Sequence, residues 1–202
     1  MEDKKLDAWY LYRTQASFRF GFHGTSEEVG NQVINGQTPL AMSENTYDWL
    51  GRGIYFWESD PQRALDWAQE QEKRGKLKNP AVIGAILDLG YCLDLGTQPA
   101  IGEVKKAYKY LARIYRDADE QLPQNRSGKD LLMRELDCQV INTLHRYRKN
   151  KSFRAYDSVR CAFLEAERVY PTSGFRRKTH VQIAILNKDC IKGYFLPISG
   201  GS

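Results

Sequence analysis

The sequence predicts a single α+β domain with a helical insertion. Five short segments rich in β-branched and aromatic residues are typical of strands, and helical patterns lie between them. A long helical block separates the first three strand segments from the last two, so the sheet must draw strands from both ends of the chain. The predicted strands cover residues 18–24, 53–57, 81–89, 180–186 and 190–196.

Two helices are predicted between the first strands. Thr25 and Glu28 have the spacing of a capping box, which favours a helix directly after the first strand. The stretch "SDPQRALDWAQEQEKRG" is clearer still, because Ser59 or Asp60 can cap the helix and Gly75 can end it.

The helical block from Gly102 to about Tyr147 contains two amphipathic patterns, broken by "DEQLPQNRSGKD". One apolar face is expected to hold Val104, Tyr108, Leu111 and Tyr115, and the other Leu131, Leu132, Leu136, Val140, Ile141 and Leu144. Residues 102–160 contain 14 basic and 8 acidic side chains, a net charge of +6 against +5 for the whole chain. Such a stretch could face an anionic partner or form a solvated helical face.

The composition limits the classes of protein to which this chain can belong. With 27% charged residues and no long apolar segment, the sequence predicts neither a signal peptide nor a membrane span, and we expect a cytoplasmic protein. The cysteines lie far apart without a CxxC pair, which favours buried free thiols over a zinc site or a disulfide framework: Cys92, Cys138, Cys161 and Cys190. We expect residues 1–198 to form one domain, with the basic insertion at about 102–150, and residues 199–202 to be a linker remnant.

Two short motifs carry the information about function. "FHGT" at residues 22–25 ends the first predicted strand, and "GRGIYFW" opens the second. Gly51 and Gly53 bracket a tight turn, but the third glycine of a Rossmann fingerprint is missing and no P-loop is present. Taken alone, His23 is better explained by a core or capping histidine than by a functional one.

In order and spacing, these motifs are similar to the H-G-T and G-x-G-I-Y-F segments of the poly(ADP-ribose) polymerase and diphtheria-toxin-like ADP-ribosyltransferase superfamily. The segment "FLEAERVYPTSGFRRKTHVQIAILNKDCIKGYFLP" looks like the end of its bacterial toxin or phage-defence branch. The resemblance covers residues 18–90 and 160–197. It implies a split antiparallel β-sheet that holds NAD, the donor substrate, in an open cleft.

The resemblance also assigns roles to residues. It implies that His23 hydrogen-bonds the nicotinamide ribose, that the Gly24 backbone contacts the nicotinamide amide, and that Tyr55 stacks on its ring. The loop at 37–51 would cover the donor. The remaining residues expected to bind NAD are Thr25, Tyr47, Gly53 and Phe56, with Trp49 as a further loop contact.

The catalytic carboxylate is the open question. Cleavage of the nicotinamide–ribose bond builds an oxocarbenium-like sugar, which a nearby carboxylate stabilises. Gln182 lies where the resemblance implies a glutamate, and glutamine can bond a hydroxyl but carries no charge. The catalytic acid is therefore expected to be Glu165, which we favour, Glu167 on the same segment, or Glu58. The alternative is that the chain has lost transfer activity and only binds its ligand.

The acceptor is expected to be a nucleic acid, with RNA favoured. "HRYRKNKSFR" at 145–154 interleaves cations with Tyr147 and Phe153, which suits a single strand as well as a solvated helix end. "FRRK" at 175–178 adds charge near the candidate acid. The expected protein is a toxin or anti-phage effector, with an antitoxin or chaperone as a possible partner. A protein-directed transferase, an NAD glycohydrolase and a silent NAD- or RNA-binding module are the alternatives.

Overall fold

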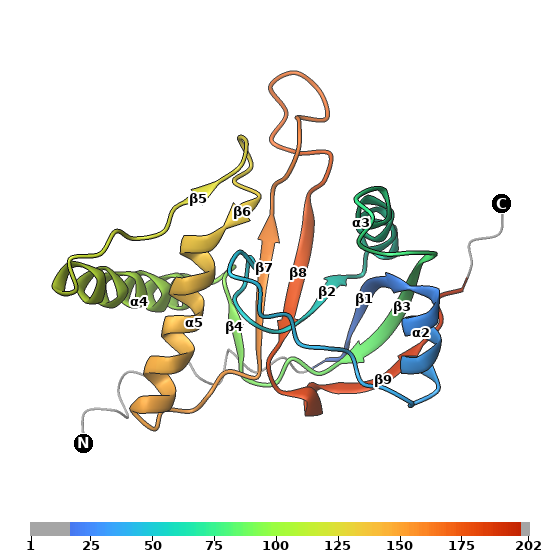
Figure 1. The fold of residues 1–202 in the computed structure, drawn as a ribbon, viewed down its shortest axis with the longest axis horizontal. Coiled ribbons are helices and arrows are strands. Elements are labelled where there is room, and N and C mark those ends of the chain that lie inside the picture. Colours follow the sequence, from blue (N-terminus) through green and yellow to red (C-terminus); the bar gives the residue numbers. More distant parts are fainter. Residues whose placement is uncertain (1–16, 199–202) are drawn as a thin grey trace.

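The computed structural model describes residues 17–198, which form a seven-stranded sheet with helices packed against it (Figure 1). The strand order is β4-β7-β8-β2-β1-β3-β9. All neighbouring pairs are antiparallel except β4 and β7, which are parallel. The expected α+β class is confirmed, but the sheet is mixed rather than antiparallel throughout. The strands are β1 Arg19–Ser26, β2 Ile54–Glu58, β3 Pro80–Leu87, β4 Cys92–Asp94, β7 Ser158–Phe163, β8 His180–Ile185 and β9 Ile191–Phe195.

Four α-helices and a small hairpin complete the described part of the chain. The hairpin of β5 and β6 forms a separate two-stranded sheet beside α5 (Figure 1). Helix α3 packs against β1 and β3, and α4 packs against α5 at the other end of the sheet. The elements are α2 Glu27–Ile34, α3 Pro61–Lys73, α4 Gln98–Asp117, β5 Asn125–Arg126, β6 Met133–Arg134, α5 Glu135–Asn150 and the short 3₁₀ helix η2 Lys188–Cys190.

The predicted helix starts are close to those observed. Ser26, one residue after the predicted Thr25, caps α2 by accepting a hydrogen bond from the Val29 amide at 3.3 Å. Asp60 rather than Ser59 caps α3, where its carboxylate accepts from the Arg63 amide at 2.9 Å. Both caps satisfy an amide that the first helical turn leaves unpaired.

Strands β4 and β7 were not predicted from the sequence. β4 is only three residues long, which is too short for an alternation pattern. β7 contains Arg160, whose side chain makes ion pairs with Glu58 at 2.6 Å and Asp94 at 3.2 Å. An ion-paired arginine within a buried strand hides the apolar pattern on which sequence-based prediction depends.

The helical insertion belongs to the same core as the sheet. Leu111 of α4 and Val140, Ile141 and Leu144 of α5 pack in one cluster with Val159 of β7. Not all of the expected faces are buried, however: Tyr108, Leu131 and Leu132 are exposed, and the two leucines precede α5. The insertion is therefore a structural part of the domain.

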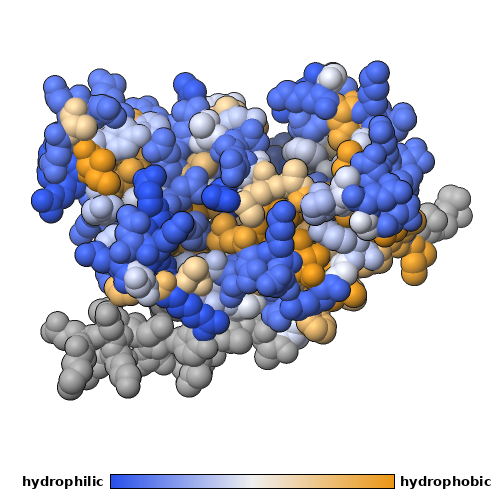
Figure 2. Space-filling model, turned by 60° about the horizontal axis from the view of Figure 1, so that its bottom comes forward, coloured by the Kyte–Doolittle hydropathy of each residue, from blue (hydrophilic) through white to orange (hydrophobic). Residues whose placement is uncertain are grey.

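A second core cluster lies on the opposite face of the sheet and includes Val33 of α2, Phe56 of β2 and Ile83 of β3. All four cysteines are free thiols, three of them buried and Cys161 partly exposed. Within residues 17–198, no helix has both the length and the apolar character needed to span a membrane. The surface is largely hydrophilic, with a hydrophobic patch near the C-terminal end, where Leu196 and Ile198 are exposed (Figure 2).

Candidate functional site

Strands β1 and β2 separate at His23. The two strands pair at two positions, Gly21 with Glu58 and Phe22 with Trp57. Beyond these pairs, β1 continues along β3 and β2 continues along β8. We call this place the fork: residues 23–26 of β1 and 54–56 of β2.

The imidazole of His23 bridges the fork. Its Nδ1 atom lies 2.7 Å from the carbonyl oxygen of Tyr55. Because a carbonyl oxygen only accepts, Nδ1 carries the proton and Nε2 presents a lone pair. Burial lowers the pKa of His23, so the ring is neutral at pH 7, and no partner for Nε2 is found among the described residues. The fork therefore holds an acceptor suited to a hydroxyl or amide N–H.

The phenol of Tyr55 is occupied by the loop that precedes β2. Its hydroxyl donates to the Gly51 carbonyl at 2.6 Å and accepts from the Leu50 amide at 2.8 Å. Burial raises the pKa of Tyr55 well above its usual value of 10, so the hydroxyl stays protonated. The phenol thus fixes the turn at residues 50–51.

The His23 and Tyr55 side chains do not face each other. Tyr55 packs against the cluster that contains Leu50, whereas its neighbour Phe56 belongs to the cluster on the other face, as alternation along a strand requires. The His23 ring lies 5.8 Å from the Phe56 ring. The two predicted residues therefore meet through the Tyr55 peptide, and a ligand could reach both only at the fork. This differs from the expectation that both rings hold the same end of NAD.

Of the other residues predicted to bind NAD, Gly24, Thr25 and Phe56 belong to the fork and Gly53 directly precedes it. Gly24 packs directly on α3: a Cβ at this position would lie 2.3 Å from the carbonyl oxygen of Ala64. A Cβ on Gly53 would lie 2.9 Å from the Ala184 side chain. Both glycines thus permit close packing. Thr25 and Phe56 are buried, and Tyr47 is half-buried in the loop before β2.

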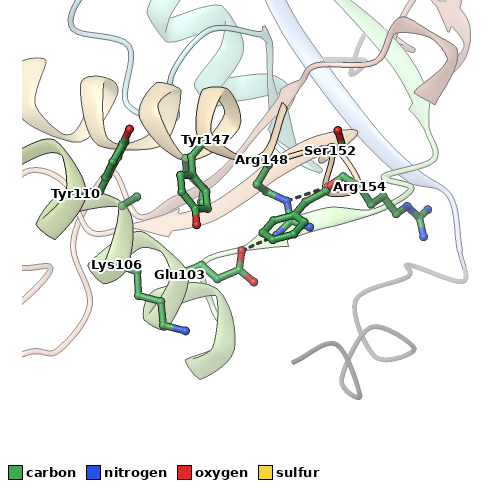
Figure 3. Close-up of a pocket in the computed structure, with 10 residues that line it drawn as sticks. Glu103, Lys106, Tyr110, Tyr147, Arg148, Ser152 and Arg154 are labelled. Atoms are coloured by element: carbon green, nitrogen blue, oxygen red, sulfur yellow. Dashed lines mark hydrogen bonds and ion pairs between the residues drawn. The ribbon is translucent and has the colours of Figure 1, made fainter. Parts of the chain in front are cut away.

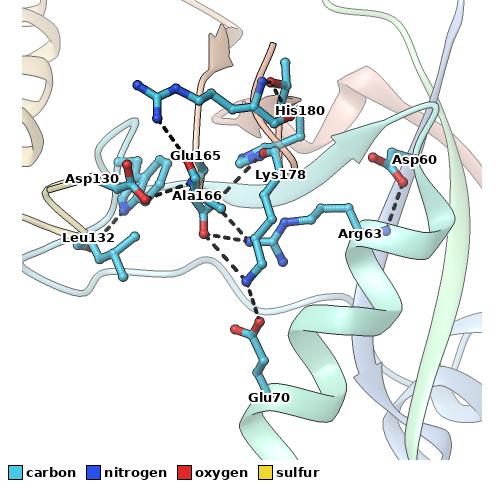
Figure 4. A network of polar contacts seen from close by, with 12 residues as sticks. Asp60, Arg63, Glu70, Asp130, Leu132, Glu165, Ala166, Lys178 and His180 are labelled. Atoms are coloured by element: carbon cyan, nitrogen blue, oxygen red, sulfur yellow. Dashed lines mark hydrogen bonds and ion pairs between the residues drawn. The ribbon is translucent and has the colours of Figure 1, made fainter. Parts of the chain in front are cut away.

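A second group of polar side chains gathers around Glu165. This carboxylate follows β7, is only 7% exposed, and accepts from Nη2 of Arg63 at 3.1 and 3.4 Å (Figure 4). Nζ of Lys178 lies 3.9 Å from the same carboxylate and Nδ1 of His180 lies 3.8 Å from it. Glu165 is therefore a buried anion beside a guanidinium.

Several buried polar atoms in this group have no hydrogen-bond partner. His180 directs Nδ1 at the Lys178 carbonyl, 2.7 Å away, so its buried Nε2 is an unpaired acceptor, as is Oε1 of Gln182. Nε1 of Trp57 and the Nε and Nη1 atoms of Arg63 are unpaired donors. We call Trp57, Arg63, Glu165, His180 and Gln182 the Arg63–Glu165 cluster.

The cluster draws on α3, β2, β8 and the segment after β7, and it adjoins the fork. Trp57 pairs with Gln182 across β2 and β8, and the Arg63 guanidinium lies 5.7 Å from the Trp57 ring. Trp57 also pairs with Phe22, the residue before His23. Because neighbouring strands lie about 4.8 Å apart, Phe22 and Gln182 are separated by roughly 10 Å. The segments that carry His23, Tyr55 and Gln182 are therefore neighbours on three adjacent strands.

The two other candidate acids lie outside the cluster. Glu167 follows Glu165 on the same loop, and it is exposed and paired with Arg177 at 2.8 Å. Its pKa is lowered by a backbone hydrogen bond and by Arg177. Glu58 is paired with Arg160, and as the neighbour of Trp57 in β2 it points to the opposite face of the sheet.

Three members of the cluster were missed or read differently from the sequence. Arg63 lies in a helix whose charged residues give no sign of burial, and Trp57 lies in an aromatic strand segment that is typical of a core. His180 opens β8 and shares a strand face with Gln182. A buried histidine that opens a strand was the one available signal. Within residues 17–198, no three His, Cys, Asp or Glu side chains are grouped so that they could hold a metal ion.

Comparison with known proteins adds no relative: no family model, no curated protein and no solved structure matches the chain.

Proposed function

We propose that the protein is an NAD-dependent ADP-ribosyltransferase. The observation that carries the proposal is a buried carboxylate, Glu165, beside Arg63 and His180, whose buried side chains keep donor and acceptor atoms without a partner. Gln182, two positions after His180 in β8, adds a further unpaired acceptor. Buried polar groups are normally paired, and each unpaired one costs about 1–3 kcal/mol. A ligand rich in hydroxyl groups, such as a ribose, would satisfy donors and acceptors together.

The chemistry that this arrangement suits is cleavage at the anomeric carbon of a ribose. The C1′–N bond to nicotinamide breaks, and its electron pair leaves with the nicotinamide, which becomes neutral. C1′ then carries positive charge until an acceptor oxygen or nitrogen attacks it and loses a proton to water. Glu165 would stabilise the cationic sugar, and Gln182 and His180 would bond its hydroxyls.

His23 would contribute from the fork. Its neutral ring has an oriented lone pair at Nε2, which can accept from a ribose hydroxyl or from the nicotinamide amide. The Tyr55 carbonyl holds the ring in this tautomer. The phenol of Tyr55 would act indirectly, because it fixes the loop that precedes β2.

The test is nicotinamide release from NAD, together with mass spectrometry of RNA, DNA and proteins for an added ADP-ribose. Glu165→Gln should lower the rate by about 100-fold or more, as expected for loss of an electrostatic stabiliser of the transition state. Glu167→Gln and Glu58→Gln are matched controls and should keep most of the activity. Equal loss in all three variants, or no release by the folded wild-type protein, would contradict the proposal.

A catalytically silent NAD- or RNA-binding module is the second candidate, and the bond from Arg63 to Glu165 supports it. A carboxylate held by a guanidinium is less available to a cationic sugar. This candidate predicts that NAD protects the protein against thermal unfolding without any release of nicotinamide. The transferase predicts both effects.

For the biological setting, we propose a cytoplasmic toxin or anti-phage effector that modifies a nucleic acid, with RNA favoured. A protein acceptor is the alternative, and an antitoxin or chaperone would restrain the activity. Growth arrest on expression of the wild-type protein, relieved by Glu165→Gln, is the expected result. Arrest that persists in this variant would argue against transfer as its cause.

A further inference from the structure

The groove between α4 and the C-terminal half of α5 is a second candidate binding site, separate from the Arg63–Glu165 cluster. It has a volume of about 790 Å³, and Figure 3 shows residues that line it. Ala107 and Leu144, both buried, lie at its base, and α4 and α5 supply its two walls. Pockets of about 300–1,000 Å³ commonly hold ligands of nucleotide size.

Aromatic side chains line this groove in a row. Tyr110 of α4, Tyr147 of α5 and Phe153 in the turn after α5 are 46%, 37% and 37% exposed. The ring centroids of Tyr110 and Tyr147 are 5.5 Å apart at 63°, and those of Tyr147 and Phe153 are 6.2 Å apart at 67°. In each pair the rings meet edge to face, so a contact uses the edge of one ring and one face of the other, and no two of these rings are stacked in parallel. The Arg148 guanidinium lies over the Phe153 ring, 5.8 Å from its centroid.

Positive charge accompanies the row. The lining includes Lys106, Arg148 and Arg154 but a single acid, Glu103. Arg148 is held in place: it bonds Glu103 at 3.1 Å and the carbonyl of residue 154 at 2.8 Å. Lys106 is exposed on α4 and directs its ammonium group to the lower rim in Figure 3. The structure thus places an ion-paired arginine and an exposed lysine beside aromatic rings.

We infer that this groove binds single-stranded nucleic acid, with bases against Tyr110, Tyr147 and Phe153 and phosphates near Lys106. Flat rings accept any unpaired base, and cations neutralise the backbone, which together produce binding with little sequence preference. A duplex hides its bases within the stack and offers only phosphates. That the bound strand is also the acceptor for ADP-ribose rests on the proposed function; the binding itself does not.

The test is fluorescence anisotropy of a labelled RNA of about ten nucleotides, without NAD, at several salt concentrations. Tyr110→Leu, which keeps the apolar bulk, should weaken binding at least about fivefold, since one stacked base contributes about 1–3 kcal/mol. Lys106→Gln should reduce the slope of log affinity against log salt by about 0.7. Tyr108→Leu and Lys105→Gln are matched controls, because both positions are exposed on α4 outside the groove, and they should bind like the wild type.

Further measurements distinguish base stacking from binding by charge alone. An abasic strand of the same length keeps its phosphates and should bind weakly, with no sensitivity to Tyr110→Leu. Equal affinity for the abasic strand or a duplex, or equal loss in Tyr108→Leu, would overturn the inference. Failure of the wild-type protein to bind any strand would also overturn the inference and would favour a protein partner for the groove. Nicotinamide release by Tyr110→Leu, measured with NAD alone, reports on the transferase separately, so the two proposals can fail independently.

Discussion

The ion pair between Arg63 and Glu165 offers the sharpest test of the candidate site. The two residues lie 102 positions apart in the sequence, and their side chains are 10% and 9% exposed. Removing one partner of such a pair leaves a buried charge without its counter-charge, which costs about 3–5 kcal/mol. Arg63→Met should therefore lower the free energy of unfolding by an amount near the lower end of that range, because Lys178 lies 3.9 Å from the carboxylate and can move towards it.

The double variant distinguishes an ion pair from two independent contributions. In Arg63→Met/Glu165→Leu both charges are gone, so the second substitution should cost much less than it does alone. We expect a coupling free energy of about 2–3 kcal/mol. Urea unfolding at pH 7, followed by circular dichroism, measures the four free energies of the cycle.

The exposed pair of Glu167 and Arg177, with a comparable separation of 2.8 Å, is the matched control. Solvent screens this pair, so its cycle should show no resolvable coupling. Additive effects at Arg63 and Glu165, or equal coupling in both cycles, would refute the claim that Glu165 is a buried, guanidinium-bound anion.

Three further predictions concern single residues. Tyr55→Phe leaves the Leu50 amide and the Gly51 carbonyl without their partner. The free energy of unfolding should therefore fall by about 1–3 kcal/mol, and hydrogen exchange at the Leu50 amide should accelerate. Unchanged exchange would contradict this role. Burial lowers the pKa of His145 to about 4. Between about pH 6.5 and pH 4, His145 is therefore protonated in the unfolded chain but neutral in the folded protein. Stability should thus fall as pH drops from 6.5 towards 4, and His145→Leu should remove about 2 kcal/mol of that loss in urea titrations; parallel pH profiles would argue against it. Gly24→Ala should destabilise the folded protein by about 2 kcal/mol or more, because the new Cβ would clash with the Ala64 carbonyl. Gly102→Ala, in open space on α4, should stabilise it by about 0.5–1 kcal/mol. Thermal melts that rank the two variants the other way would contradict the packing described.

Local features of the chain could be predicted because they depend on near neighbours. Asp60 caps α3 through an amide three residues away, and His180 and Gln182 share one face of β8 because side chains alternate along a strand. Gln182 was identified because it lies where the resemblance implies a glutamate, and Glu165 because the expected chemistry needs a carboxylate and the same resemblance favours its position. These inferences needed no knowledge of which strands are neighbours.

The sequence by itself determined the α+β class, most of the strands and the types of side chain available for chemistry. Only the tertiary structure decided that Arg63 meets Glu165 across 102 positions, that His23 and Tyr55 point to opposite faces, and that β7 joins the sheet. The physical reason is that register and strand order arise from burial and hydrogen bonding between distant segments. A one-residue shift in register would move every side chain of a strand to the other face, and the pattern along the chain does not record which register is chosen.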